Sequence, residues 1–373
     1  KAGRWNGSIW INDTISSACI DAGDKSSDYS AEPEDNGNRI NIGAYGNTKY
    51  ASKSGNSTNN YIVAPNFTEI QVSINKSDQC DPAIYLDRVV WNDNRNGNSD
   101  IYIQDFSTSK ETRITTNNSW VSDPAIYGNR IVWQDGRNGN SDIYMYNIST
   151  FTETRVTTNG SWASSPVIYG DKIIWDDNRN GNSDLYMYNL STLNETVITT
   201  NKYDQVRPAI YGDRIVWQDA RNGNWDIYMY NISNSSETQI TSIKSDQVSP
   251  AIYRDKILWQ DARNGNWDIY MYNISTASEI RVTANESDQY EPEIYGDRIV
   301  WKDNRNGNSD ICIYTLSTNK TEHTTNESWQ GNPTIYGERI VWDDGRNGNS
   351  DIYACNLSIG IPEPDKIGNG IPG

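Results

Sequence analysis

The sequence is poor in the side chains that most often carry acid–base, nucleophilic or metal chemistry. Its 373 residues include one histidine and four cysteines, and these cysteines are too scattered for a disulfide scaffold or a zinc site. The histidine, His323, has no nucleophile set beside it, which argues against a Ser-His-Asp triad. No phosphate-binding loop or dinucleotide fingerprint occurs. We therefore expect a non-enzymatic protein with no catalytic residues and no organic cofactor.

Long apolar runs and an excess of basic residues are also missing. No window of 18 apolar residues occurs, so we expect no transmembrane helix in this sequence. There are 32 basic residues against 49 acidic ones, which gives a net charge of -17. Such a surface lacks the basic patch that releases counterions from phosphate, so we expect no nucleic-acid partner.

The residues that are abundant point to β-structure and to export. The chain has 14 Trp and 24 Tyr but only 3 Phe, and turn formers such as Asn and Gly are frequent, which is typical of all-β proteins. About seventeen Asn-x-Ser/Thr sequons occur, an excess that favours an extracellular, cell-surface glycoprotein. The candidate glycosylation sites include Asn66, Asn75, Asn117, Asn147, Asn159, Asn189, Asn231, Asn273, Asn285 and Asn326.

A repeat organises most of the chain. Seven tryptophans are spaced 42 residues apart, with 41 residues in the last interval, and each follows a P-x-I-Y motif and precedes an R-N-G-N-x-D motif. A period of about 40 to 45 residues with several short strands per unit is the mark of a β-propeller blade. We therefore predict seven blades. The repeated tryptophans are Trp91, Trp133, Trp175, Trp217, Trp259, Trp301 and Trp342.

The fourth unit shows how a blade is expected to form. We predict four antiparallel strands at Ala209–Tyr211, Arg214–Gln218, Asp226–Asn231 and Glu237–Thr241. The Asn-Gly pair at 222–223 predicts a hairpin turn between the second strand and the third, because both residues tolerate positive φ. Strands two and three are apolar on both faces, as expected for sheets packed between two neighbours.

The two ends of the repeat array predict how the ring closes. The seventh unit stops after its third strand, whereas a matching fourth strand occurs before the first unit, at Thr68–Ser73. We expect this N-terminal strand to complete the last blade, because an unclosed ring would leave an exposed sheet edge.

These motifs resemble the TolB-type propeller repeat, and most closely the seven-unit propellers of surface-layer and cell-surface proteins of methanogenic archaea. The shared elements are P-x-I-Y, I-V-W and RNGN-x-DIY. Residues 17–53, with ACIDAGD and RINIGAYGNT, resemble instead the last rungs of a pectate-lyase-like right-handed parallel β-helix. The resemblance implies β-helix rungs over 1–53, a linker over 54–66, the propeller over 67–358 and a Pro/Gly-rich linker over 359–373.

Acidic loops are the first candidate site. The segment WQDARNGNWDIYMYN from Trp217 to Asn231 looks like a calcium loop, but it lacks the oxygen ligands that an EF-hand requires, so a structural turn explains it better. Loops entering the inner strands carry further aspartates, which form either a solvating acidic face or a cation site, such as one for Ca2+, at the channel mouth. The candidate metal ligands are Asp78, Asp123, Asp204, Asp246 and Asp288.

Tryptophans that depart from the repeat are the second candidate site. Trp225 and Trp267 replace a serine in the RNGN-S-D turn, whereas Trp120, Trp162 and Trp329 lie in the loops that enter units two, three and seven. Such side chains either stack on a ligand such as a sugar or fill the gap between neighbouring loops. A disulfide between Cys80 and Cys355 across the ring closure is a further candidate feature.

The leading functional hypothesis is a non-enzymatic extracellular module that serves as an envelope, adhesion or binding element for other surface proteins or glycans. One alternative is the binding module of a carbohydrate-active enzyme, a lyase or hydrolase, whose active site lies upstream. A second alternative is self-association into a lattice or filament through the flat propeller faces.

Overall fold

The computed structural model describes residues 3–5, 10–12, 68–305 and 307–357, which fall into two compact units. In the first unit a short antiparallel hairpin is described, formed by β1 (Gly3–Trp5) and β2 (Trp10–Asn12). The predicted β-helix rungs, both predicted linkers, Cys19 and the sequon at Asn66 lie almost wholly outside the described residues and stay predictions. In the described part of the chain, no helix is long and apolar enough to span a membrane.

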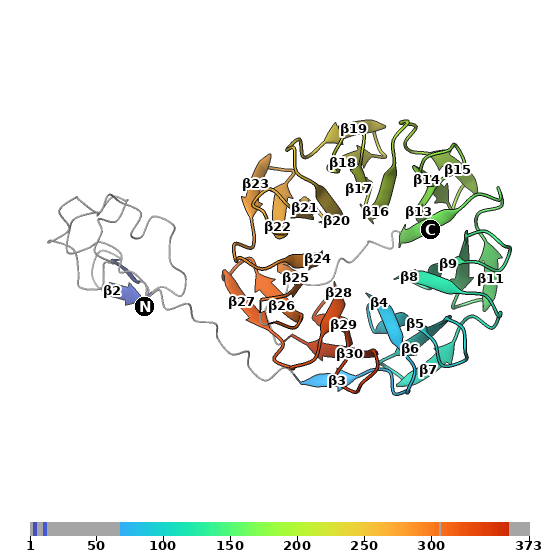
Figure 1. The fold of residues 1–373 in the computed structure, drawn as a ribbon, viewed down its shortest axis with the longest axis horizontal. Coiled ribbons are helices and arrows are strands. Elements are labelled where there is room, and N and C mark those ends of the chain that lie inside the picture. Colours follow the sequence, from blue (N-terminus) through green and yellow to red (C-terminus); the bar gives the residue numbers. More distant parts are fainter. Residues whose placement is uncertain (1–2, 6–9, 13–67, 306, 358–373) are drawn as a thin grey trace, which may run out of the picture. The chain divides into compact units, whose positions relative to one another are not determined.

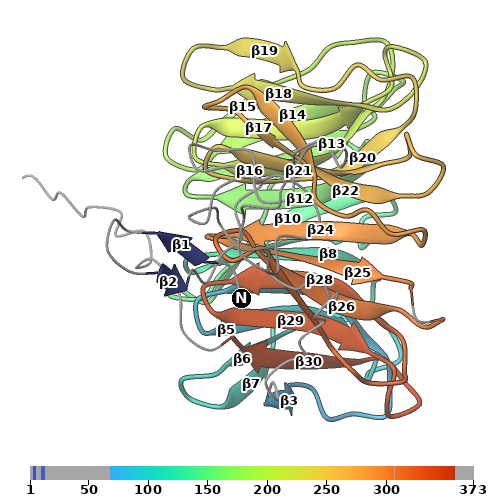
Figure 2. The same cartoon turned by 90° about the vertical axis from the view of Figure 1, so that its left-hand side faces the viewer.

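The second unit is a propeller of seven four-stranded antiparallel sheets around a central channel (Figure 1), which confirms the predicted fold class. Figure 2, turned by 90°, shows the inner strands running roughly along the channel axis. The inner strands, one for each of blades one to seven, are β4 (Gln79–Tyr85), β8 (Val121–Tyr127), β12 (Ala163–Tyr169), β16 (Gln205–Tyr211), β20 (Gln247–Tyr253), β24 (Gln289–Tyr295) and β28 (Gln330–Tyr336).

In blades one to six the second, third and outermost strands follow the inner strand in chain order; blade seven takes its outermost strand from the start of the propeller. The second strands are β5 (Arg88–Asp93), β9 (Arg130–Asp135), β13 (Lys172–Asp177), β17 (Arg214–Asp219), β21 (Lys256–Asp261), β25 (Arg298–Asp303) and β29 (Arg339–Asp344). The third strands are β6 (Asp100–Asp105), β10 (Asp142–Asn147), β14 (Asp184–Asn189), β18 (Asp226–Asn231), β22 (Asp268–Asn273), β26 (Asp310–Thr315) and β30 (Asp351–Asn356). The outermost strands of blades one to six are β7 (Lys110–Arg113), β11 (Thr152–Arg155), β15 (Asn194–Val197), β19 (Ser236–Gln239), β23 (Ser278–Arg281) and β27 (Lys320–His323).

The ring closes as predicted. The outermost strand of blade seven is β3 (Glu69–Gln71), which pairs antiparallel with β30, so residues about 280 positions apart in sequence share one sheet. The backbone N–H of Val72 continues this pairing by donating to Ile352. An ion pair between Arg346 and Glu69, with 2.7 Å between Nη1 and Oε2, joins the same two segments.

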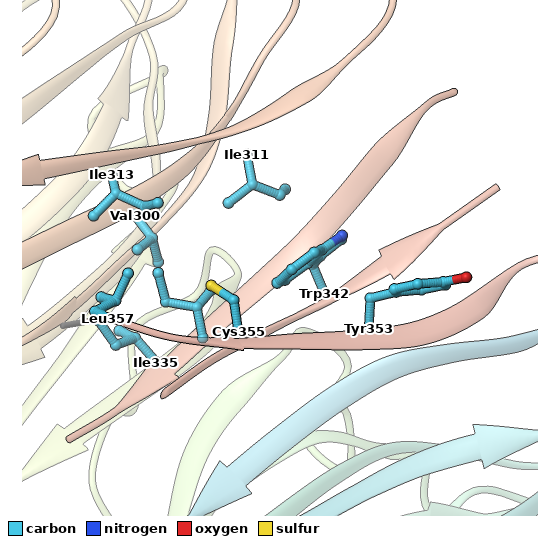
Figure 3. Packing of buried hydrophobic residues seen from close by; sticks show 9 residues of the cluster. Val300, Ile311, Ile313, Ile335, Trp342, Tyr353, Cys355 and Leu357 are labelled. Carbon is cyan, nitrogen blue, oxygen red and sulfur yellow. The ribbon is translucent and has the colours of Figure 1, made fainter. Parts of the chain in front are cut away.

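The core lies between the blades rather than inside any one of them. Figure 3 shows Val300 and Ile311 of blade six facing Trp342 and Cys355 of blade seven in one apolar cluster. The repeated tryptophans are all nearly or fully buried, with Trp301 the most exposed at 2%. Burying a large apolar side chain contributes about 1.5–3 kcal/mol, so each blade depends on both of its neighbours for its stability.

The RNGN segment is a structural turn. In blade four, Asp219 is fully buried and accepts hydrogen bonds from the indole of Trp217 at 3.0 Å and from Arg221 at 2.6 Å. The Arg221 guanidinium also lies 4.1 Å from the ring centroid of Tyr228 and forms an ion pair with Glu237 on the outer strand. This repeated clip ties the second, third and fourth strands together, which accounts for the calcium-like composition without a metal.

Candidate functional site at the channel mouth

Each inner strand carries a bulge at the same point, just before its proline. In blade four the pairing of β16 with β17 shifts register between Val206 and Ala209, and Arg207 has a φ of 54°. Positive φ is uncommon for residues other than glycine and persists only where the surroundings fix it. The equivalent residues all have φ between 46° and 55° and form what we call the bulge ring: Asp81, Asp123, Ser165, Arg207, Ser249, Glu291 and Asn332.

Side chains from the preceding blade hold this backbone in place. The amide of Ser249 donates to Gln218 Oε1 at 3.0 Å, and the amide of Glu291 donates to Gln260 Oε1 at 2.7 Å. Blade six has Lys302 at the position of these glutamines, and a lysine ammonium cannot accept a hydrogen bond. There Glu291 Oε2 accepts from the amide of Asn332 at 2.8 Å instead. The backbone link between blades is therefore kept even where the repeat changes.

Five residues of the bulge ring, all except Asp123 and Ser165, line one end of a cavity of about 330 Å³ in the channel. Five of the repeated prolines form its collar, and the next residue inward also reaches it in blades one, six and seven. We call this next position the alanine layer; it is Ala83, Ala125, Val167, Ala209, Ala251, Glu293 and Thr334.

At the other end of the inner strands, seven tyrosines form a closed ring. Each ring centroid lies 4.7–5.1 Å from the next, and the circle is complete from Tyr85 through Tyr336 and back to Tyr85. Burial, followed by the neighbouring tyrosines, raises the pKa of Tyr127 and Tyr336 above the usual range, so these phenols stay protonated. This tyrosine ring narrows the channel beyond the alanine layer.

Burial shifts the pKa of one carboxyl group that lines the cavity, Glu293, and of two that contact the bulge ring, Asp176 and Asp343. Desolvation by the channel wall raises the pKa of Glu293 to about 7, and burial raises that of Asp176 to about 6. Burial also raises the pKa of Asp343 well above its usual range, although Asn332 Nδ2 donates to its Oδ2 at 2.7 Å. Groups with shifted pKa values in a cavity are candidates for ligand contact.

The five candidate metal aspartates do not occupy equivalent positions. Asp78, Asp204, Asp246 and Asp288 each accept a backbone N–H from the preceding blade at 2.9–3.0 Å, which makes them caps of the neighbouring turn. Asp123 instead belongs to the bulge ring. In the part of the chain that the structure describes, no group of three or more His, Cys, Asp or Glu residues could hold a metal ion.

The departing tryptophans occupy two kinds of place. Trp120, Trp162 and Trp329 stand at the position of the capping aspartates and are 40–48% exposed. Trp120 and Trp162 stack on each other, with centroids 5.9 Å apart, while Trp120 and Trp329 also cover Gly136 and Gly345. Trp225 and Trp267 are half-buried, and their backbone amides donate to Asp246 and Asp288. These contacts show packing of the loops, whereas ligand stacking stays a prediction.

The predicted disulfide does not form. Cys80, Cys312 and Cys355 are all free thiols. Cys80 lies on an inner strand, where its Sγ is 3.5 Å from Asp81 Oδ2, whereas Cys355 lies two strands further out in the apolar cluster between blades six and seven. The two side chains therefore belong to different layers of the propeller.

The sequons fall into two sets, and whether they carry glycans stays a prediction. Asn147, Asn189, Asn231 and Asn273 end third strands at the outer turns. Those in the loops that enter blades form Asx turns, and three of them also bond across blades: Asn117, Asn159 and Asn285 donate to Asp135, Asp177 and Asp303 at 3.2, 3.1 and 3.5 Å. The remaining members of this set are Asn75 and Asn326.

Comparisons with known proteins agree with this architecture. The TolB from Acinetobacter baumannii is 19% identical with a TM-score of 0.50, and the match covers 63% of this chain and 62% of that one. An oligogalacturonate lyase from Vibrio parahaemolyticus is 10% identical with a TM-score of 0.61, covering 80% of this chain and 96% of that one. A puromycin-hydrolyzing peptidase from Mycobacterium tuberculosis is 10% identical with a TM-score of 0.62, covering 78% and 53%.

At these identities the likeness shows the fold alone, and the chain spans less than two thirds of that TolB and about half of that peptidase. A comparison with curated proteins gave no match. The family model of the TolB beta propeller domain matches residues 169–360, which is more than half of the sequence. The chain therefore belongs to the TolB beta propeller domain family.

Proposed function

We propose that this chain is a non-enzymatic binding module of a cell envelope or cell surface, and that its partner docks over the channel mouth. The observation that carries the proposal is the bulge ring. Seven equivalent positions share one backbone conformation, with φ between 46° and 55°, yet they carry aspartate, serine, arginine, glutamate and asparagine side chains. The fold requires the backbone at these positions, so the variation in their side chains is free to serve recognition.

The exposed side chains around the bulge ring also favour docking of a partner at the channel mouth. Asp123 and Arg207 of the bulge ring are exposed, and Trp120 and Trp162 are exposed in the neighbouring loops. Arginine and tryptophan are enriched among the residues that dominate protein interfaces, and tryptophan also stacks on sugars. A mixed surface of this kind suits a protein or a glycan partner better than a nucleic acid.

The proposed location outside the cell rests on the sequons and on the acidic charge. Intact mass of the protein from its native source tests it directly. Addition of hexose or related increments at outer-turn sequons such as Asn147 is the expected result. A mass equal to that of the unmodified chain contradicts the glycoprotein part of the proposal.

Site-specific photo-crosslinking tests the docking face. A photoreactive residue replaces Arg207 in the bulge ring in one variant and Glu195 on the outer strand β15 in a control variant. Both side chains are exposed, but only the first lies at the channel mouth. We expect adducts with native surface proteins or glycans from the first variant alone. Equal adducts from both variants, or none from either, contradict docking at the mouth.

The alternative is an enzymatic role. The match to the oligogalacturonate lyase, which covers 96% of that chain, is the reason to test it. A screen of the purified chain against polysaccharides and oligouronides decides between the two. Turnover by the chain itself contradicts the non-enzymatic proposal. Self-association into a lattice is tested in the same preparation by light scattering with and without calcium.

A further inference from the structure

We propose that the channel cavity is a binding site for a lysine-type ammonium, an alkylammonium side chain of the partner that reaches through the mouth to Glu293. This inference deepens the proposed function and rests on it for the identity of the partner. It concerns a single position in the alanine layer, together with the charges that surround it.

Glu293 departs from its six equivalents in both size and charge. The equivalents are four alanines, one valine and one threonine, so nothing in the repeat requires a carboxylate at this point. In the described part of the chain Glu293 has no ion-pair partner, and the hydrogen bond that its carboxylate accepts comes from the backbone N–H of Ile294. Glu293 is exposed to the open channel, so a ligand that enters through the mouth can reach its carboxylate.

The wall of the cavity fits an alkylammonium. Pro82, Pro292 and Pro333 belong to an apolar collar between the mouth and Glu293, and Ala83 continues it inward. The Thr334 hydroxyl lines the same cavity and is a second acceptor near the carboxylate. Lysine side chains bury an aliphatic stem while a polar group holds the ammonium. A cavity of about 330 Å³ admits one such side chain but not a folded segment.

The charges around the cavity favour a cation. Asp81 and Glu291 line it together with Glu293, and among the described residues of the lining the one basic side chain is Arg207, on the opposite side in blade four. The neighbouring ionisable groups behind this wall are Asp123 of the bulge ring, Lys302 with its Nζ 4.0 Å from Glu291 Oε1, Asp176, Asp343 and the tyrosine ring. Lys302 is drawn towards Glu291, so it does not neutralise the carboxylate of Glu293.

A buried carboxylate outside the cavity lining, Asp343, contacts two residues of that lining, Asp81 and Asn332. Asp343 is 1% exposed, and its Oδ1 has no hydrogen-bond partner in the described part of the chain. Its other oxygen accepts from Asn332 Nδ2 at 2.7 Å, and Asn332 Nδ2 also lies 3.1 Å from Asp81 Oδ1. Asp343 thus holds Asn332 in place beside the cavity, while Asp81, Glu291 and Glu293 are the carboxylates that line it.

The repeat itself supplies the test variants. Glu293→Ala installs the residue that blades one, two, four and five already carry, and Glu293→Gln keeps the shape while removing the charge. The control Glu327→Ala removes one exposed carboxylate from the loop that enters blade seven. The probe is Nα-acetyl-lysine methylamide, and its norleucine counterpart has the same alkyl stem without the ammonium. Binding to the full chain is measured by calorimetry at about pH 8, where Glu293 is charged.

We expect one lysine probe per chain, with affinity falling about tenfold or more in both Glu293 variants and unchanged in Glu327→Ala. A shift of the Ala83 methyl resonance on addition of the probe places it in the cavity. Glu293→Ala should melt at the same temperature as the wild type or higher, because the variant loses an unpaired carboxylate. Equal affinity in the Glu293 variants, equal binding of the norleucine probe, or occupation by calcium or potassium ions alone overturns the proposal.

The outcomes for the two proposals are separable. If the lysine probe binds but no partner crosslinks at the mouth, the cation site stands and the docking proposal fails. If a partner crosslinks equally well to the wild type and to Glu293→Ala, the docking proposal stands and the cation site fails.

Discussion

Trp120 covers Gly136 so closely that a β-carbon at Gly136 would overlap the indole nitrogen. The same relationship recurs between Trp329 and Gly345. In blade four the equivalent positions hold Asp204 and Ala220, joined by the same backbone hydrogen bond from residue 220 to residue 204. Glycine therefore accompanies tryptophan at two blade entrances, whereas Trp162 is joined to Asn178 by the equivalent hydrogen bond.

Gly136→Ala should destabilise the propeller by about 1–3 kcal/mol, because the added methyl group displaces the indole of Trp120. The double variant Trp120→Asp with Gly136→Ala recreates the pair of blade four and should recover most of that loss. Urea denaturation followed by tryptophan fluorescence measures both. A double variant no more stable than the single one would show that the pairing has another cause.

Glu291→Ser should destabilise the link between blades six and seven by about 1–3 kcal/mol, because the amide of Asn332 then loses its acceptor. Adding Lys302→Gln restores the glutamine that blades two, four and five carry at this position, and it should return the acceptor. Thermal melts of the four members of this cycle give the coupling. Additive effects of the two substitutions would contradict the compensation.

Glu293 should make the propeller less stable as the pH rises. Its pKa in the folded state, about 7, lies above its ordinary value of 4.5, so the folded state binds the proton more tightly than the unfolded state. This contribution is fully present below pH 4.5 and is lost as the pH rises through about 7. Melting temperatures of the wild type and Glu293→Ala across this window should converge at low pH and diverge above it. Parallel curves would contradict the assignment.

Removal of residues 1–73 should open the ring, because β3 and the two residues after it are the outer edge of blade seven. A matched chain that lacks residues 1–63 keeps this strand. We expect the shorter chain to melt at a lower temperature and to be cleaved by protease in blade seven, while the matched chain behaves as the full one. Equal melting temperatures would show that the ring does not need this strand.

The sequence predicts the blades, their number and the closing strand well, because these depend on local patterns that recur seven times. It does not predict the bulge ring. The inner strand of blade four was expected at Ala209–Tyr211, but β16 begins at Gln205, since the bulge at Arg207 interrupts the alternation by which a strand is recognised. Positive φ at a residue before proline is set by contacts with the preceding blade, which no local pattern contains.

The difference between the candidate metal aspartates was already detectable in the sequence. Asp78 stands four residues before its proline, whereas Asp123 stands one residue before its own, so alignment on the prolines separates them. The same alignment places Trp120, Trp162 and Trp329 at the position of Asp78. The sequence also shows that Glu293 replaces an alanine of the repeat, but only the structure shows that this position lines a cavity. The candidate disulfide between Cys80 and Cys355 could not be judged from the sequence, because the distance between the two residues depends on the folded ring.

The bulge ring has a consequence for how such a molecule can change. A side chain of the preceding blade accepts the backbone N–H at five of its seven positions, so a substitution at a position whose own side chain holds no neighbouring blade, such as Arg207, alters the recognition surface while leaving these bonds in place. Duplication or exchange of whole blades would reorder the same side chains around the mouth. Binding specificity can therefore change through the order of side chains around the channel mouth while the propeller backbone is kept.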